Sequence, residues 1–301
     1  MISLVGRSRR LLNNGIIVIQ AHLTRCKLSK FKKELCSDYL NSTERAVKVT
    51  VSLTSMPNRM KYLHLTLYSL LRQSFKPDRV VLWLAEQQFP SRENEIPGAV
   101  LSLKKYGLEI RWYHDIKSYK KLIPGLKTFP DDIIVTADDD VFYDKEWLAK
   151  LYEGYIESPD CISFHRGARI SFDQNGVMKP YVDWQEATPE HKESYLNFFT
   201  GVGGVLYPPG SLDPEVVDEN KFMELCPSGD DIWFWAMAVK NGTKIKVVKN
   251  NITLTIDTCP ERQFFKQRNT LFLVNCLEGK NDQMIDNVVK RYKLDKKLKA
   301  Q

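Results

Sequence analysis

The sequence has no long apolar run. The longest one near the start, GIIVIQ over residues 15–20, is far shorter than the roughly 18 or more apolar residues of a transmembrane helix. It also lacks the small-residue cleavage site that a secretory signal peptide needs. We therefore expect a cytoplasmic protein without a membrane-spanning helix.

Signatures of several other classes are missing as well. The six cysteines are scattered, with no CxxC pair and no Cys/His spacing of the zinc type, so free thiols in a reducing compartment are expected. A P-loop GxxxxGK[ST], a DxDxT nucleophile signature and an obvious activated Ser or Cys are absent. These absences count against the main alternative, a metal-dependent phosphoryl-transfer or hydrolytic enzyme. Sequons at Asn41, Asn241 and Asn251 would matter only in a secreted protein.

The net charge of +7 is concentrated at the two ends of the chain. Residues 1–50 carry ten Lys/Arg against three Asp/Glu, a net of +7, and residues 290–301 carry six against one, a net of +5, which leaves −5 between them. Basic ends suit an anionic membrane surface, with about 1 kcal/mol for each nearby Lys or Arg. A solvated helical face is an equal alternative. Because no nucleic-acid-binding motif is present, nucleic acid is not an expected partner.

Strands and helices alternate from residue 46 onward. Apolar strands are expected over 47–53, 79–85, 108–113 and 133–137, and helices over 61–73, 98–105 and 118–127. The second half continues with a helix over 146–156, a strand over 161–167, a Gly/Pro-punctuated turn region over 202–210, a helix over 230–242 and late strands over 244–250 and 252–257. This order predicts an α/β fold with a mixed, mainly parallel sheet and helices on both faces.

The 301 residues are enough for one large domain with a full core. No repeat or low-complexity linker divides residues 46–301, so we predict a single catalytic domain there. Its nucleotide-binding half would cover 46–143, and an acceptor-side half with a C-terminal helix would cover 144–301. Residues 1–45 form a separate basic segment, for which a helix is one option.

Three consecutive aspartates, Asp138, Asp139 and Asp140, follow the apolar strand IIVTA. Adjacent carboxylates raise each other's pKa unless a partner such as a divalent cation neutralises them. Mg²⁺ and Mn²⁺ prefer hard oxygen ligands and combine one or two carboxylates with substrate phosphates. In an extended segment Asp138 and Asp140 would share one site, at the carboxyl ends of the strands, while Asp139 faces elsewhere. A helix cap or a solvated acidic turn is the alternative.

Four segments in this order resemble GT-A glycosyltransferases. The strand ending in ADDDVFY is similar to their DxD signature, and residues 51–85 resemble their nucleotide-binding first half. Together SYKKLIPGLK, IIVTADDDVFY, GVGGVLYPPGSL and DDIWFWAMAVKNG resemble family 2-like bacterial glycosyltransferases of lipopolysaccharide and capsule assembly. The resemblance, which runs from residue 47 to the end, implies a Rossmann-like GT-A fold, a nucleotide-sugar donor (UDP-sugar favoured), a glycan or lipid-linked acceptor and a divalent cation, Mn²⁺ or Mg²⁺. Independently of the resemblance, the basic ends lead us to expect a cytoplasmic protein that is peripheral on the inner face of the membrane.

The resemblance also implies individual roles on the donor side. It assigns to the donor and nucleotide Thr54, Ser55, Arg59, Lys120, Lys121, Asp138 and Asp139, and to the metal Asp140 and Asp138. Arg59 would reach base or phosphate, although a solvated helix-start residue is the even alternative. One of Lys120 and Lys121 would offset diphosphate charge while the other faces solvent, and the sequence does not rank them.

On the acceptor side, an inverting transferase needs a carboxylate that takes the proton of the acceptor hydroxyl. In GT-A enzymes it commonly lies in an acidic pair at the start of a late helix, a position that Asp230 and Asp231 match, with Asp231 favoured. The same pair would also stabilise the helix dipole without any chemistry. Gly203 and Gly204 would let the backbone approach donor or acceptor closely, or only form a turn.

Aromatic residues offer weaker candidates. Trp184, Trp233 and Trp235 could stack on sugar rings, but Trp233 and Trp235 suit the core better because WFWAMAV is apolar throughout. Many metal-dependent GT-A enzymes add a late histidine ligand, whereas all five histidines here precede residue 192. Asp257 is a substitute, or phosphates and water complete the metal shell. A non-catalytic protein that keeps the fold and binds membrane or glycan is a third hypothesis.

Overall fold

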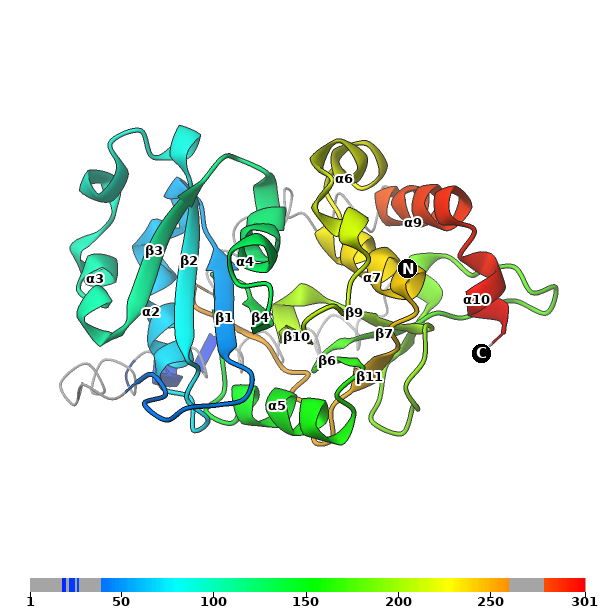
Figure 1. Cartoon of the computed structure of the whole chain (residues 1–301), viewed down its shortest axis with the longest axis horizontal. Coiled ribbons are helices and arrows are strands. Elements are labelled where there is room, and N and C mark those ends of the chain that lie inside the picture. The colour runs from blue at the N-terminus through cyan, green and yellow to red at the C-terminus, as the bar shows by residue number, and fades with distance from the viewer. Residues whose placement is uncertain (1–17, 20–21, 25, 27–38, 260–278, 301) are drawn as a thin grey trace, which may run out of the picture.

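The computed structural model describes residues 18–19, 22–24, 26, 39–259 and 279–300 (Figure 1). Most of the basic segment 1–45 therefore lies outside the described residues, and those described between 18 and 26 are helical. Within the described part of the chain, no helix combines the length and apolar character needed to cross a bilayer.

A seven-stranded sheet forms the centre of the molecule, in the order β11-β6-β10-β4-β1-β2-β3. Its strands are β1 (Val49–Thr54), β2 (Arg79–Ala85), β3 (Leu108–Tyr113), β4 (Ile133–Ala137), β6 (Ile162–Phe164), β10 (Val205–Tyr207) and β11 (Ile245–Val247). Neighbours pair in parallel except at β10, which is antiparallel to both β4 and β6. The predicted α/β class with a mixed, mainly parallel sheet is confirmed.

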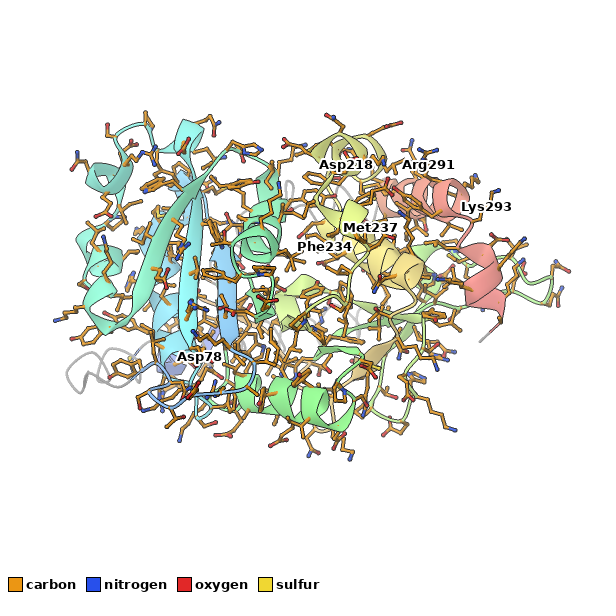
Figure 2. All side chains as sticks on the ribbon, viewed as in Figure 1. Asp78, Asp218, Phe234, Met237, Arg291 and Lys293 are labelled. Atoms are coloured by element: carbon orange, nitrogen blue, oxygen red, sulfur yellow. The ribbon has the colours of Figure 1, made fainter. Side chains whose placement is uncertain are left out.

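Helices cover both faces of this sheet (Figure 1). Ile133 and Val135 of β4 join a core with α2 (Met60–Leu71) and α5 (Trp147–Glu157), whereas Ile134 joins the core of α4 (Ile123–Thr128) and α7 (Asp230–Asn241). This alternation follows from the period of two along a strand. Phe234 and Met237 on α7 are fully buried in the second core (Figure 2).

The remaining elements are shorter. Two small antiparallel sheets combine β12 (Ile256–Asp257) with β5 (Val141–Phe142), and β8 (Gln185–Glu186) and β9 (Asn197–Phe199) with β7 (Gly167–Arg169). The other α-helices are α3 (Gly98–Leu101), α6 (Glu219–Leu225), α9 (Lys280–Tyr292) and α10 (Asp295–Lys299). The 3₁₀ helices are η1 (Pro57–Arg59), η2 (Glu86–Gln88), η3 (Arg92–Glu95), η4 (Lys104–Tyr106), η5 (Lys117–Lys121), η6 (Tyr181–Asp183), η7 (Gly201–Gly203) and η8 (Pro214–Val217).

Several predicted boundaries were wrong. The expected turn region 202–210 contains β10, a central strand, because its apolar core of three residues is too short to stand out between glycines and prolines. The expected helix 118–127 is divided into η5 and α4. Pro124, in the first turn of α4, has no N–H to continue a helical ladder from η5. The strand expected over 161–167 is split into β6 and β7, and the helix expected over 98–105 into α3 and η4.

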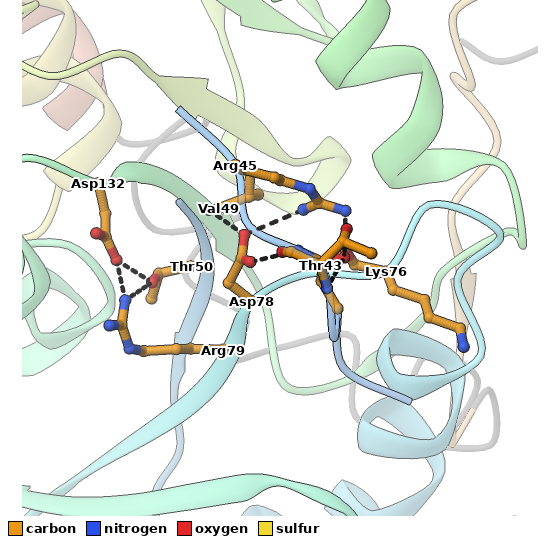
Figure 3. A network of polar contacts seen from close by, with 9 residues as sticks. Thr43, Arg45, Val49, Thr50, Lys76, Asp78, Arg79 and Asp132 are labelled. Atoms are coloured by element: carbon orange, nitrogen blue, oxygen red, sulfur yellow. Dashed lines mark hydrogen bonds and ion pairs between the residues drawn. The ribbon is translucent and has the colours of Figure 1, made fainter. Parts of the chain in front are cut away.

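An ion-paired cluster lies at the amino-terminal ends of β1, β2 and β4 (Figure 3). We call this end of the parallel strands the amino edge, and the opposite end the carboxyl edge. Asp78 accepts hydrogen bonds from Val49 N (2.8 Å), Arg45 Nη1 (3.0 Å) and Asn41 Nδ2 (2.7 Å). Next to it, Asp132 accepts hydrogen bonds from Thr50 Oγ1 (2.6 Å) and from the guanidinium of Arg79. These contacts attach the chain before β1 to the sheet and align β1, β2 and β4.

Candidate active site

The three aspartates lie where β4 ends, beside the end of β1. Leu53 of β1 pairs with Ala137 of β4, so the residues after these two positions meet. Ser55 Oγ donates a hydrogen bond to Asp139 Oδ2 at 2.5 Å, and the main-chain carbonyl of Asp139 accepts one from Thr66 Oγ1 at 2.9 Å. Asp139, which is 5% exposed, is thus held by its neighbours.

Arg59, the last residue of η1, brings a guanidinium to the same place. Its Nη1 lies 2.5 Å from Asp139 Oδ1 and 2.9 Å from Asp140 Oδ2. Burial alone would lower the pKa of Arg59, but Asp139 and Asp140 outweigh burial and raise it. Arg59 is therefore an ion-paired cation of the site, not simply a solvated residue at a helix start.

In the structure Asp138 and Asp140 are paired with different cations, and the expectation that Asp139 faces away from Asp140 was wrong. Asp139 and Asp140 share Arg59, whereas Asp138 Oδ1 lies 3.2 Å from Lys121 Nζ. The reason is that residues 139 and 140 form a bend after β4, so the alternation of an extended strand does not continue through them.

Lys121 connects the aspartates to the start of α7. Besides Asp138, its Nζ lies 2.9 Å from Asp230 Oδ2 and 3.7 Å from Asp231 Oδ1. Burial alone would lower the pKa of Lys121, but Asp138, Asp230 and Asp231 hold it well above its ordinary value. The acid pair that was predicted on a separate helix thus joins the three aspartates through one buried lysine.

The two lysines of SYKKL have different partners. The Lys120 ammonium is paired with Asp115 and does not reach the aspartates after β4. The expectation that one of the two lysines faces solvent was wrong, because Lys120 is 2% and Lys121 5% exposed. The 3₁₀ geometry of η5 turns both side chains inward, toward different acids.

Gly201 is a site residue that the sequence analysis missed. Its N–H donates to Asp231 Oδ2 at 2.8 Å. A Cβ atom there would lie 2.5 Å from Lys121 Nζ and 2.8 Å from Asp231 Oδ1, so a larger residue would displace these two charged groups. The GVGG pattern was a signal for close approach, but it was assigned to the next glycines along.

Gly203 and Gly204 pack against Trp147. The carbonyl of Gly203 accepts a hydrogen bond from Trp147 Nε1 at 2.8 Å. Gly204 has φ +93°, and a Cβ atom there would lie 2.4 Å from the same indole nitrogen. The two glycines thereby fix the conformation of the loop that places Gly201 beside Asp231.

Tyr143 is a second residue that the sequence analysis did not assign to the site. Its hydroxyl accepts a hydrogen bond from Asp138 N at 2.7 Å and donates one to the carbonyl of Val202 at 3.4 Å. The aromatic pair after the aspartates was the signal for it. Tyr143 links the turn after β4 to the glycine loop, which keeps Asp138 and Gly201 in register.

The tryptophan candidates are all buried. Trp233 and Trp235 are fully buried, and each donates its indole N–H to a main-chain carbonyl, which confirms their expected place in the core. Trp184 is 9% exposed and packs against Tyr181 and Phe198. The buried ring of Trp184 offers no face for stacking on a sugar.

Negative charge is in excess at this edge. Among the described residues, the five carboxylates of Asp138, Asp139, Asp140, Asp230 and Asp231 are ion-paired with two cations, Arg59 and Lys121. Burial, together with Asp139, Asp138 and Asp257, raises the pKa of Asp140 to about 7 against the pull of Arg59. Burial and Asp230 likewise raise the pKa of Asp231 to about 7, although Lys121 and Gly201 N–H oppose them.

The chemistry of these residues fits a hard divalent cation. The donor set consists of carboxylate oxygens in excess over their counter-cations, which is what Mg²⁺ or Mn²⁺ prefers. Within the described residues, no group of three or more His, Cys, Asp or Glu is arranged to hold a metal ion. Asp257, on β12, influences Asp140 through its charge. A cation bound by Asp138 and Asp140 would therefore need oxygens from substrate or water as well.

Comparisons with known proteins found similarity in structure alone. No protein-family model and no curated protein matches the chain. The structure of S. aureus TarS 1–349 is 21% identical over 82% of this chain and 72% of that chain, with a TM-score of 0.46. TarS 1–349 in complex with UDP is 17% identical over the same shares (TM-score 0.44). GalNAc-T7 with UDP, GalNAc and Mn²⁺ is 13% identical over 68% of this chain and 43% of that chain (TM-score 0.44).

These identities and TM-scores are too low to establish a shared function. What the described residues define is an α/β protein with an acidic, partly neutralised site at the carboxyl ends of β1 and β4. Open α/β sheets bind their ligands at such ends.

Proposed function

We propose that the chain is a metal-assisted glycosyltransferase of the GT-A type. It would transfer a sugar from a nucleotide-sugar, with a UDP-sugar favoured, to a glycan or lipid-linked acceptor in cell-surface polysaccharide biosynthesis. One observation carries the proposal. Lys121 joins Asp138, on the predicted donor side, and Asp231, on the predicted acceptor side, within 3.2 Å and 3.7 Å of one ammonium group. Such a site can hold both substrates of a transfer reaction.

On the donor side, the loop after β1 would hold the nucleotide. Thr54 donates its hydroxyl to the Trp83 carbonyl, which ties this loop to β2 and leaves Arg59 directed at the aspartates. Asp138 and Asp140 would hold a Mn²⁺ or Mg²⁺ ion. When bound, such a cation would stabilise the negative charge that builds on the departing diphosphate. Lys121 would add a fixed positive charge on the other side of Asp138.

On the acceptor side, Asp231 would act as the general base. Its buried Oδ1 has no hydrogen-bond partner among the described residues and lies 3.7 Å from Lys121 Nζ, while Gly201 N–H fixes Oδ2. The acceptor hydroxyl would give its proton to Asp231 as its oxygen forms a bond to the anomeric carbon. The bond from that carbon to the diphosphate oxygen breaks, and its electron pair leaves with the nucleoside diphosphate. This step is an inverting transfer.

A screen of nucleotide-sugars with purified protein tests this function directly. We expect release of nucleoside diphosphate from one donor, even as slow hydrolysis without acceptor, and thermal stabilisation by UDP in the presence of Mn²⁺. Asp140→Ala should lose the metal-dependent part of that stabilisation while keeping its fold. If UDP, GDP and CMP all leave the melting temperature unchanged with metal present, the glycosyltransferase proposal fails.

We further propose that the protein is peripheral on an anionic membrane face. The exposed basic side chains of Lys293, Lys296 and Lys299 near the chain end support attraction to such a surface. Sedimentation with anionic vesicles should show binding at low salt that is lost at high salt. Absence of binding at low salt would contradict this part of the proposal.

A further inference from the structure

Arg59 lies where a divalent cation is expected. One nitrogen of its guanidinium contacts both Asp139 and Asp140, at 2.5 Å and 2.9 Å. A cation held by Asp140 would need the carboxylate that this nitrogen already faces. Arg59 occupies Oδ2 of Asp140, so a divalent cation on this carboxylate would share Oδ2 with the guanidinium or bind through the adjacent Oδ1, and in either case the two positive charges would repel.

The two aspartates hold Arg59 unequally. The Asp139 side chain is 5% exposed and also accepts a hydrogen bond from Ser55. The Asp140 side chain is 29% exposed, and in the described part of the chain Arg59 is its one ion-pair partner. The arginine side chain is itself 37% exposed. The guanidinium can therefore leave Asp140 at a small cost, provided that another anion receives it.

We propose that Arg59 is the built-in counter-cation of Asp140 and competes with the divalent cation for it. This inference rests on the proposed function, because the anion that would draw Arg59 away is the diphosphate of the nucleotide. Guanidinium groups bind phosphate oxygens well, often through two parallel hydrogen bonds. Cation and nucleotide would then bind cooperatively, since each frees the partner that the other needs.

A competition of this kind makes a specific prediction for the free protein. Mn²⁺ alone should bind weakly to the wild type and more tightly when UDP is present. Arg59→Gln should strengthen binding of Mn²⁺ alone by about tenfold, within the usual range of coupling between sites. The strengthening by UDP should shrink by a similar factor. Arg59→Lys, which keeps a positive charge, should lie between the two.

Mn²⁺ binding is measured by electron paramagnetic resonance of the free ion, which requires no turnover. Arg79→Gln is the matched control, because it also removes an arginine that is ion-paired with an aspartate, Asp132, at the amino edge (Figure 3). It should leave Mn²⁺ affinity at the wild-type value. Circular dichroism checks the fold of each variant, and Arg59→Lys serves if Arg59→Gln does not fold.

The proposal is overturned if Arg59→Gln binds Mn²⁺ alone no more tightly than the wild type, or if Arg79→Gln strengthens binding equally. It is also overturned if UDP binds the wild type equally well with and without Mn²⁺. These failures differ from a failure of the proposed function, which would appear as no binding of any nucleotide. The titration with Mn²⁺ alone tests the role of Arg59 whether or not a nucleotide binds.

Discussion

The two ends of the parallel strands carry opposite electrostatic designs. At the amino edge, Asp78 and Asp132 are each matched by one arginine, Arg45 and Arg79. At the carboxyl edge, the described carboxylates outnumber Arg59 and Lys121. Balanced pairs at the first edge serve folding, because removal of either partner leaves an uncompensated charge. The imbalance at the second edge opposes folding, and a bound cation would relieve it.

The largest expected effect comes from Asp231→Asn at the carboxyl edge. Loss of a general base lowers turnover by about 10²- to 10⁴-fold, whereas UDP affinity should stay near the wild-type value. The rate of UDP release in the presence of acceptor measures this effect. Asp132→Asn, at the amino edge, is the matched control and should keep most of its activity once folded. A variant Asp231→Asn that turns over at more than about a tenth of the wild-type rate would remove Asp231 from this role.

At the amino edge, Asp78→Ala should affect stability and spare UDP binding. The substitution leaves Val49 N–H, Asn41 and Arg45 without their shared acceptor. We expect a loss of about 2–4 kcal/mol in the free energy of unfolding, measured with urea. Glu86→Ala breaks the exposed pair with Arg92 and should cost at most about 1 kcal/mol. Equal losses in the two variants would contradict the structural role of the amino-edge cluster.

The last prediction concerns how the free energy of unfolding depends on pH, and it would sharpen the contrast between the two edges. Asp140 and Asp231 have pKa values raised to about 7, above those of the unfolded chain. Between about pH 4 and pH 7 the folded protein therefore holds protons that the unfolded chain has lost, so stability falls as pH rises. We expect the free energy of unfolding to decrease from pH 5 to pH 8 without metal. Asp140→Asn should flatten this slope, and a stability that rises over the same range would contradict it.

The sequence predicted the strands of the first half well because each is a continuous apolar run. The strand over 79–85 coincides with β2. The prediction from sequence failed at β10, whose three residues pair with strands that come much earlier in the chain. A short strand of this kind is specified by its neighbours in the sheet and not by its own residues.

For the site, the sequence identified the acids but not their partners. Asp138 stood out through local composition and Asp231 through the family resemblance, yet their common contact with Lys121 depends on where η5 places that side chain. The same holds for Lys120, which is one residue away and pairs with Asp115. Tertiary contacts decide between adjacent lysines, and no local pattern records that choice.

The reversed direction of β10 determines how the site is assembled. A parallel strand contributes the loop that follows it, but β10 runs the other way, so Gly201–Gly203 enters the carboxyl edge from the segment before the strand. The proposed donor side, which follows β1 and β4, and the glycine loop before β10 therefore come from separate stretches of chain that can vary independently. If the proposed function holds, an insertion before β9 would change which acceptor is admitted, while the ends of β1 and β4 keep the proposed donor side intact.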